Sequence, residues 1–119
     1  MANTFIVQKL GGSFKDKYEL AEKYYTLLSA LNNLRLTERD VQLIAFTAVK
    51  GNMSYANYRE EFCKKYSTSS PTINNIISKL KKMGVLIKDN GKIKVVPVLV
   101  LDFEKDVKLL MSLEHGQTN

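Results

Sequence analysis

The chain is poor in the side chains on which most metal sites and nucleophilic enzymes depend. Among its 119 residues, Cys63 is the only cysteine, His115 is the only histidine, and tryptophan is absent. A single cysteine cannot form an internal disulfide, so we expect a protein of the reducing cytoplasm. One cysteine and one histidine also exclude a cysteine-rich zinc site and argue against a Cys–His or Ser–His–Asp catalytic group. The sequence therefore predicts no enzyme, no cofactor and no metal.

Long apolar runs are missing as well. No stretch approaches the roughly 18 consecutive apolar residues of a membrane span, so we expect no contact with a membrane. The N-terminus also lacks the basic and apolar regions of a secretory signal. Apolar residues make up 45% of the chain and charged residues 25%, as in ordinary globular proteins. The length fits one domain.

Positive charge is concentrated in one third of the chain. Overall, 18 lysines and arginines face 12 aspartates and glutamates, which gives a net charge of +6. Residues 62–94 alone hold eight lysines and one acid, Asp89, so the rest of the chain is close to neutral. A surface that binds a polyanion needs clustered lysines, because phosphates are contacted by grouped positive charges. A solvated lysine-rich face without a partner would have the same composition, and composition leaves both interpretations open.

Hydrophobic periodicity and turn residues predict a mostly helical α+β chain of short elements. In order, these are a strand or extended arm at 4–10, a helix at 16–32, a central buried helix between Thr37 and Gly51, a helix from Ser54 to Tyr66, a helix at 71–83, a hairpin of 85–88 with 92–96, an extended segment at 98–101 and a helix at 103–113.

Capping and turn residues mark the boundaries of these elements. Thr37 and Asp40 have the spacing of a capping box, and Gly51 suits the left-handed residue that closes a helix. Asn90-Gly91 is the strongest short signal for a hairpin turn. Further N-caps are predicted at Ser54, Ser70 and Asp102.

The helix predicted at residues 71–83 separates an apolar side from a polar side. At about 100° per residue, one stripe collects Ile73, Ile76, Ile77, Leu80 and Met83. The far side carries Pro71, Asn74, Asn75, Ser78 and Lys82, with Lys79 and Lys81 at its edges. That side has no acid and no large apolar group. Its amide and ammonium groups are suited to contacting base edges and phosphates.

Residues 37–96 resemble a winged helix-turn-helix domain. The residues that carry the resemblance are Phe62, Tyr66-Ser67, Ser70-Pro71-Thr72-Ile73, Ile76, Leu80 and Gly84-Val85-Leu86. The flanking helices resemble the MarR-like arrangement, in which terminal helices build a dimer. The resemblance implies one compact domain with an N-terminal arm and helix (1–36), a winged helix-turn-helix (37–101), and a C-terminal helix and tail (102–119).

The predicted function is double-stranded DNA binding by a regulator of transcription. The helix 71–83 would contact the major groove, and lysines of residues 62–94 would contact phosphates. The predicted DNA-binding residues are Ser69, Ser70, Thr72, Asn74, Asn75, Ser78, Lys79, Lys82, Lys88, Lys92 and Lys94.

Two further expectations concern protein partners. The helices at 16–32 and 103–113 carry more apolar side chains than a winged-helix core can bury, so we expect a homodimer built from them. Neither the helix at 71–83 nor the hairpin contains an arginine. An alternative is therefore a winged-helix module that binds other proteins in a replication, transcription or virion assembly.

Overall fold

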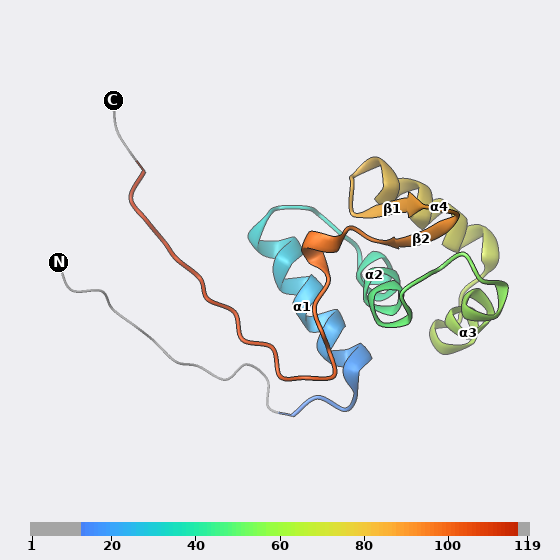
Figure 1. Cartoon of the computed structure of the whole chain (residues 1–119), viewed down its shortest axis with the longest axis horizontal. Helices are drawn as coiled ribbons and strands as arrows, with labels where there is room; N and C mark the ends of the chain where they lie inside the picture. Colours follow the sequence, from blue (N-terminus) through green and yellow to red (C-terminus); the bar gives the residue numbers. More distant parts are fainter. Residues whose placement is uncertain (1–12, 117–119) are drawn as a thin grey trace.

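In the computed structural model, which describes residues 13–116, the chain forms four α-helices followed by a two-stranded antiparallel hairpin. The helices are α1 (Lys17–Leu31), α2 (Glu38–Lys50), α3 (Ala56–Tyr66) and α4 (Ser70–Lys82), and the strands are β1 (Leu86–Asp89) and β2 (Lys92–Val95). Figure 1 shows α2 between α1 on one side and α3, α4 and the hairpin on the other. The mostly helical α+β class is confirmed. The arm predicted at 4–10 lies outside the described residues.

The first two helices begin at side chains that cap free backbone N–H groups. The Asp16 carboxylate accepts a hydrogen bond from the Glu19 N–H at 2.9 Å at the start of α1. At the start of α2, the Thr37 hydroxyl accepts from the Asp40 N–H, and the Asp40 carboxylate accepts from the Thr37 N–H. The predicted capping box is thus confirmed. Gly51, at φ 86°, closes α2 as predicted.

The core is built around α2. Leu43, Ile44 and Phe46 of this helix are fully buried, and the Phe46 ring packs between two other aromatic rings. Its centroid lies 5.6 Å from that of Tyr18 on α1 and 5.4 Å from that of Phe62 on α3. The prediction of a central buried helix is confirmed, and its aromatic contacts join the first and third helices through it.

Two predicted N-caps are displaced by one residue. Tyr55, not Ser54, precedes α3, because the Asn52 side chain accepts the Ser54 N–H at 2.9 Å and turns the chain there. Ser69, not Ser70, precedes α4, with extended backbone angles. Pro71 is consequently the second residue of α4, where its missing N–H still costs no helical hydrogen bond.

The hairpin has the predicted turn and one contact that the sequence did not indicate. Leu86 pairs with Val95, and both central turn residues, Asn90 and Gly91, have positive φ, as a two-residue hairpin of this kind requires. The loop between α2 and α3 also lies along β2. There the Met53 N–H donates to the Ile93 carbonyl at 2.7 Å, so the hairpin is tied to the helical core.

The C-terminal part differs from the prediction. Residues 97–99 form a short 3₁₀ helix instead of extended chain, and the helix predicted at 103–113, with Asp102 as its N-cap, is wrong: this segment has no regular secondary structure. Phe103 is buried against Tyr24 and Tyr25, but among residues 104–116 only Val107 is partly buried. An isolated helix of about a dozen residues is marginal in water, and here no packing stabilises it. Figure 1 shows the segment leaving the helices.

Candidate nucleic-acid interface

The polar side of α4 faces outward, as its periodicity predicts. Ile73, Ile76, Ile77 and Leu80 are buried, whereas Met83, at the end of the stripe, is exposed. The exposed side chains of α4 are those of Ser70, Pro71, Thr72, Asn74, Asn75, Ser78, Lys79, Lys81 and Lys82. The helix contains no carboxylate. One exposed surface therefore carries the predicted groups of α4, and a partner can reach them without any change in the core.

The start of α4 adds hydroxyl groups to this surface. Ser69, Ser70 and Thr72 are all exposed, and the Ser69 and Thr72 hydroxyls lie 3.1 Å apart. The first N–H groups of a helix have no partner within the helix and give that end a partial positive charge. The hydroxyls lie beside these groups, so this end of α4 offers several hydrogen-bond donors to an anion.

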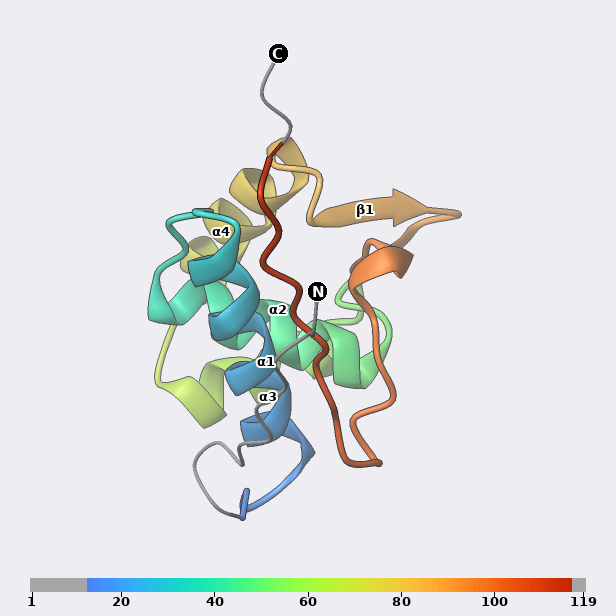
Figure 2. The same ribbon diagram turned by 90° about the vertical axis from the view of Figure 1, so that its left-hand side faces the viewer.

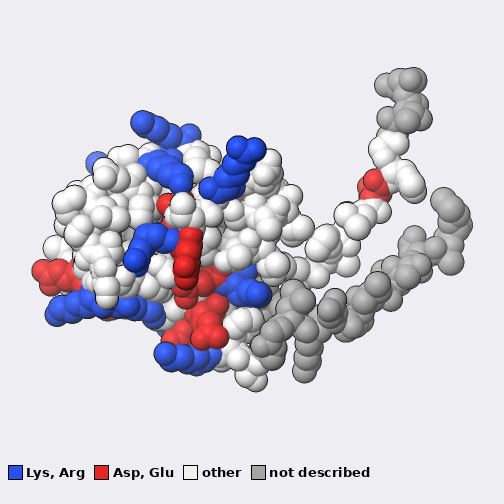
Figure 3. Space-filling view, turned by 180° about the vertical axis from the view of Figure 1, so that it is seen from behind, with Lys and Arg blue, Asp and Glu red and all other residues white. Residues whose placement is uncertain are grey.

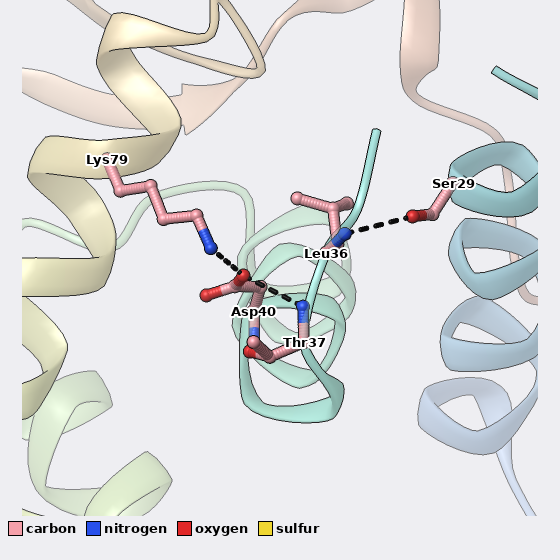
Figure 4. A network of polar contacts seen from close by, with 5 residues as sticks. All are labelled: Ser29, Leu36, Thr37, Asp40 and Lys79. Carbon is pink, nitrogen blue, oxygen red and sulfur yellow. Dashed lines mark hydrogen bonds and ion pairs between the residues drawn. The ribbon is translucent and has the colours of Figure 1, made fainter. Parts of the chain in front are cut away.

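Lys79 has a partner inside the protein. Figure 4 shows its ammonium group reaching from α4 to Asp40 at the start of α2, where it donates to Oδ2 at 2.5 Å. The same oxygen accepts the Thr37 N–H of the capping box, and the Asp40 side chain is only 4% exposed. A buried carboxylate needs such compensation for its lost hydration. Lys79 therefore fixes α4 to α2, a role that the sequence pattern did not distinguish from DNA contact.

We expect Lys79→Ala to lower the free energy of unfolding by about 1–3 kcal/mol, because it removes a charged hydrogen bond from a buried carboxylate. Lys82→Ala, which removes an equal charge from the exposed side of the same helix, is expected to change it by less than about 0.5 kcal/mol. Urea denaturation followed by circular dichroism compares the two. Equal stability of the two variants would contradict the assigned role of Lys79.

The structure brings an arginine to α4 that the sequence analysis missed. Arg59 of α3 donates through Nη1 to Asn74 Oδ1 at 2.6 Å and through Nε to the Met53 carbonyl at 3.0 Å. A signal was present: on the helical wheel of α3, Arg59 falls within about 60° of the buried Phe62. A charged side chain at the edge of an apolar stripe needs a polar partner, but the pattern does not indicate which one.

The three lysines of the hairpin do not share one face. Lys88 pairs with Ile93, and Lys94 pairs with Ile87 one position along the ladder, so Lys88 and Lys94 lie on opposite faces. Lys94 also forms an ion pair with Asp89 at 2.9 Å, and this contact lowers the pKa of the Asp89 carboxyl. Lys92 pairs with Asp89 in the ladder and thus shares the face of Lys94. Among the described residues, Lys88 and Lys92 have no ion-pair partner.

Charge is unevenly distributed over the surface. Figure 3 shows blue side chains along the upper edge of the molecule, at the height where α4 and the hairpin lie in Figure 1, and red and blue side chains mixed below. A groove of about 800 Å³ between α1 and the start of α2 is lined by three acids, Glu19, Glu22 and Glu38, and by two basic residues, Lys23 and Arg35. Burial raises the pKa of Glu22. No lining residue of this groove belongs to α4 or the hairpin.

Two other classes of site find no support in residues 13–116. No three His, Cys, Asp or Glu side chains of this part of the chain come together as ligands for a metal ion. Its helices are also too short or too polar to traverse a bilayer.

Comparison with known proteins assigns the chain to no family: no family model matches it, and neither do curated proteins or solved structures.

Proposed function

We propose that this chain is a winged helix-turn-helix protein that binds double-stranded DNA and regulates transcription. The observation that carries the proposal is the outward side of α4, which presents amide, hydroxyl and ammonium groups and no carboxylate. Groups of this kind hydrogen-bond to base edges and phosphates in the major groove. The neutral amide of Asn75 is suited to adenine, whose N6 and N7 it matches, whereas the Oδ1 of Asn74 already accepts a hydrogen bond from Arg59.

The arrangement of elements supports the winged-helix part of the proposal. Helices α2, α3 and α4 are followed at once by a hairpin, and the Met53–Ile93 hydrogen bond fixes that hairpin to the loop between α2 and α3. In the proposed complex, α4 enters the major groove and the hairpin lies along the phosphate backbone. Lys81 and Lys82 of α4 supply charge for phosphates, together with Lys88 and Lys92, which lie next to the hairpin turn on its two faces. Lys79 and Lys94 are held by carboxylates of the protein.

Arg59 is the side chain of this surface best suited to distinguishing one DNA base from another. Two of its nitrogens are held by Asn74 and Met53, which fixes the half-exposed guanidinium beside α4, and its other N–H groups have no hydrogen-bond partner within residues 13–116. An arginine held in this way is suited to guanine O6 and N7 or to a phosphate.

The experiment is a titration of a labelled random-sequence duplex at low salt, followed by fluorescence anisotropy. We expect Arg59→Ala to weaken binding about tenfold or more, the effect of losing one arginine contact. Arg35→Ala removes the same charge from an exposed loop residue that lines the groove between α1 and α2, and it is expected to leave binding unchanged. Circular dichroism checks that both variants are folded.

Absence of binding by the unaltered chain would overturn the proposal and favour the alternative, a winged-helix module that binds proteins. If Arg59→Ala and Arg35→Ala lowered the affinity for DNA equally, the result would contradict a specific α3–α4 surface, because binding would then depend only on net charge.

A further inference from the structure

The segment that follows Phe103 exposes a run of apolar side chains. Leu109 and Met111 are 47% and 57% exposed, and Leu110 and Leu113 are each 92% exposed. Soluble proteins avoid contiguous exposed apolar surface of this kind unless it is a binding site.

The backbone N–H and C=O groups of residues 106–116 also form no hydrogen bonds to other backbone groups. In the described part of the segment, the last backbone–backbone hydrogen bond is the one from the Lys105 N–H to the Asp102 carbonyl, at 3.3 Å. A helix would pair these groups. At about 100° per residue it would also gather Val107, Leu110 and Met111 on the side of Phe103. The segment thus has the sequence of an amphipathic helix and lacks only a surface to pack against.

Helix α1 presents an apolar face that can provide such a surface. Leu20, Leu27 and Leu31 lie within about 40° of one another on its wheel. Leu20 and Leu27 are half-buried, and Leu31 is 56% exposed. Phe103, packed on Tyr24 and Tyr25, already fixes the start of the segment to this helix.

As a helix, the segment cannot cover the whole of this face within its own chain. Glu104 forms an ion pair with Lys17 at 2.8 Å, so the segment starts at the N-terminal end of α1, and Figure 2 shows the chain turning back at the height of this end. Leu31, at the other end, is about 21 Å away along the axis, whereas a helix of residues 105–113 spans only about 14 Å and stops short of it. A surface that covers the whole face must therefore come from another molecule.

The net charge of the segment indicates which class of molecule supplies this surface. Residues 102–114 contain four acids, Asp102, Glu104, Asp106 and Glu114, and two lysines. Their net negative charge disfavours nucleic acid and anionic lipid surfaces, which attract basic segments. A second copy of the chain offers the apolar face of α1, with Lys23 exposed beside Leu27.

We propose that two copies of this chain associate by exchanging residues 105–113, each segment folding into a helix across α1 of the partner. A two-fold arrangement makes both contacts identical and buries both exposed surfaces. The exchange couples assembly to helix formation, so helix content rises as the dimer forms. It is independent of the DNA-binding proposal, because α4 and the hairpin take no part in it.

The test measures mass and helix content of the full chain over one concentration series, by sedimentation equilibrium and far-UV circular dichroism. The unaltered chain is expected to be a dimer at tens of micromolar and to gain helix signal as it associates. Leu110→Asp is expected to weaken the dimer at least about a hundredfold, since each dimer loses two buried leucines. Ser112→Asp adds the same charge on the opposite side of the helix and is expected to leave the dimer intact.

A mixing experiment distinguishes two kinds of dimer: one in which each segment packs on α1 of the partner, and one in which the two segments pack on each other. Leu31→Asp on α1 is expected to abolish the dimer as Leu110→Asp does, and both positions are exposed, so the monomer fold is preserved. An equimolar mixture is expected to recover heterodimers, because one intact segment then meets one intact α1. A monomeric unaltered chain, association without gain of helix, a dimer that tolerates Leu110→Asp, or no recovery on mixing would each overturn the proposal.

Discussion

Between about 50 mM and about 200 mM salt, duplex DNA binding by this chain is expected to weaken about a thousandfold. Each phosphate contact releases condensed counterions, and about five contacts give a slope of log K against log salt near −5. The groups available for these contacts are exposed or beside the exposed side of α4. They are Lys81, Lys82, Lys88, Lys92 and Arg59.

Anisotropy titrations at four or five salt concentrations give this slope directly. Lys82→Ala and Lys92→Ala are each expected to make it shallower by about one. Lys79→Ala is the matched control, because its ammonium is held by Asp40 and not by DNA, and its slope is expected to equal that of the unaltered chain. A flat salt response would contradict an interface built on phosphate contacts, and a shallower slope for Lys79→Ala would show that this lysine reaches DNA.

Phe46→Ala is expected to lower the free energy of unfolding by about 3–5 kcal/mol, the usual cost of removing a buried aromatic ring. The ring is fully buried at the centre of α2 and packs on Tyr18 and Phe62, so its loss leaves a cavity where three helices meet. The whole stability of a small domain is only about 5–15 kcal/mol, so the variant is expected to be close to unfolding at room temperature.

Urea denaturation followed by circular dichroism measures this loss. Val98→Ala, at a side chain that is 82% exposed, is the control and is expected to change stability by less than about 0.5 kcal/mol. A loss of less than about 1 kcal/mol for Phe46→Ala would mean that the core readily collapses into the space of the ring.

Features that depend on residues close in sequence were predictable. The Thr37–Asp40 capping box, the Asn90-Gly91 turn and the apolar stripe of α4 are each specified within a few residues, and each is confirmed. Their signals are local because caps, turns and helical faces are set by hydrogen bonds and spacings within one or two turns.

Features that depend on how elements meet were not predictable. The Lys79–Asp40 ion pair joins residues 39 positions apart, and the Arg59–Asn74 bond joins residues on two helices. The wheel of α4 placed Lys79 at the edge of its polar side, but a wheel does not show which neighbour lies at that edge. The helix predicted at 103–113 failed for the same reason: its periodicity is adequate, but of its apolar side chains only Phe103 and Val107 pack against the rest of the chain.

The attachment of α4 has a thermodynamic consequence for any partner that docks on it. Its four buried side chains and the Lys79–Asp40 ion pair hold the helix in place before a partner arrives. Docking on this helix therefore loses little conformational entropy, in contrast to binding by a segment that folds only on its partner. Because the exposed groups of α4 are polar, contact there also removes little apolar surface from water, and the accompanying change in heat capacity is small. The free energy of such a complex would come from released ions and hydrogen bonds rather than from a change in the shape of the protein.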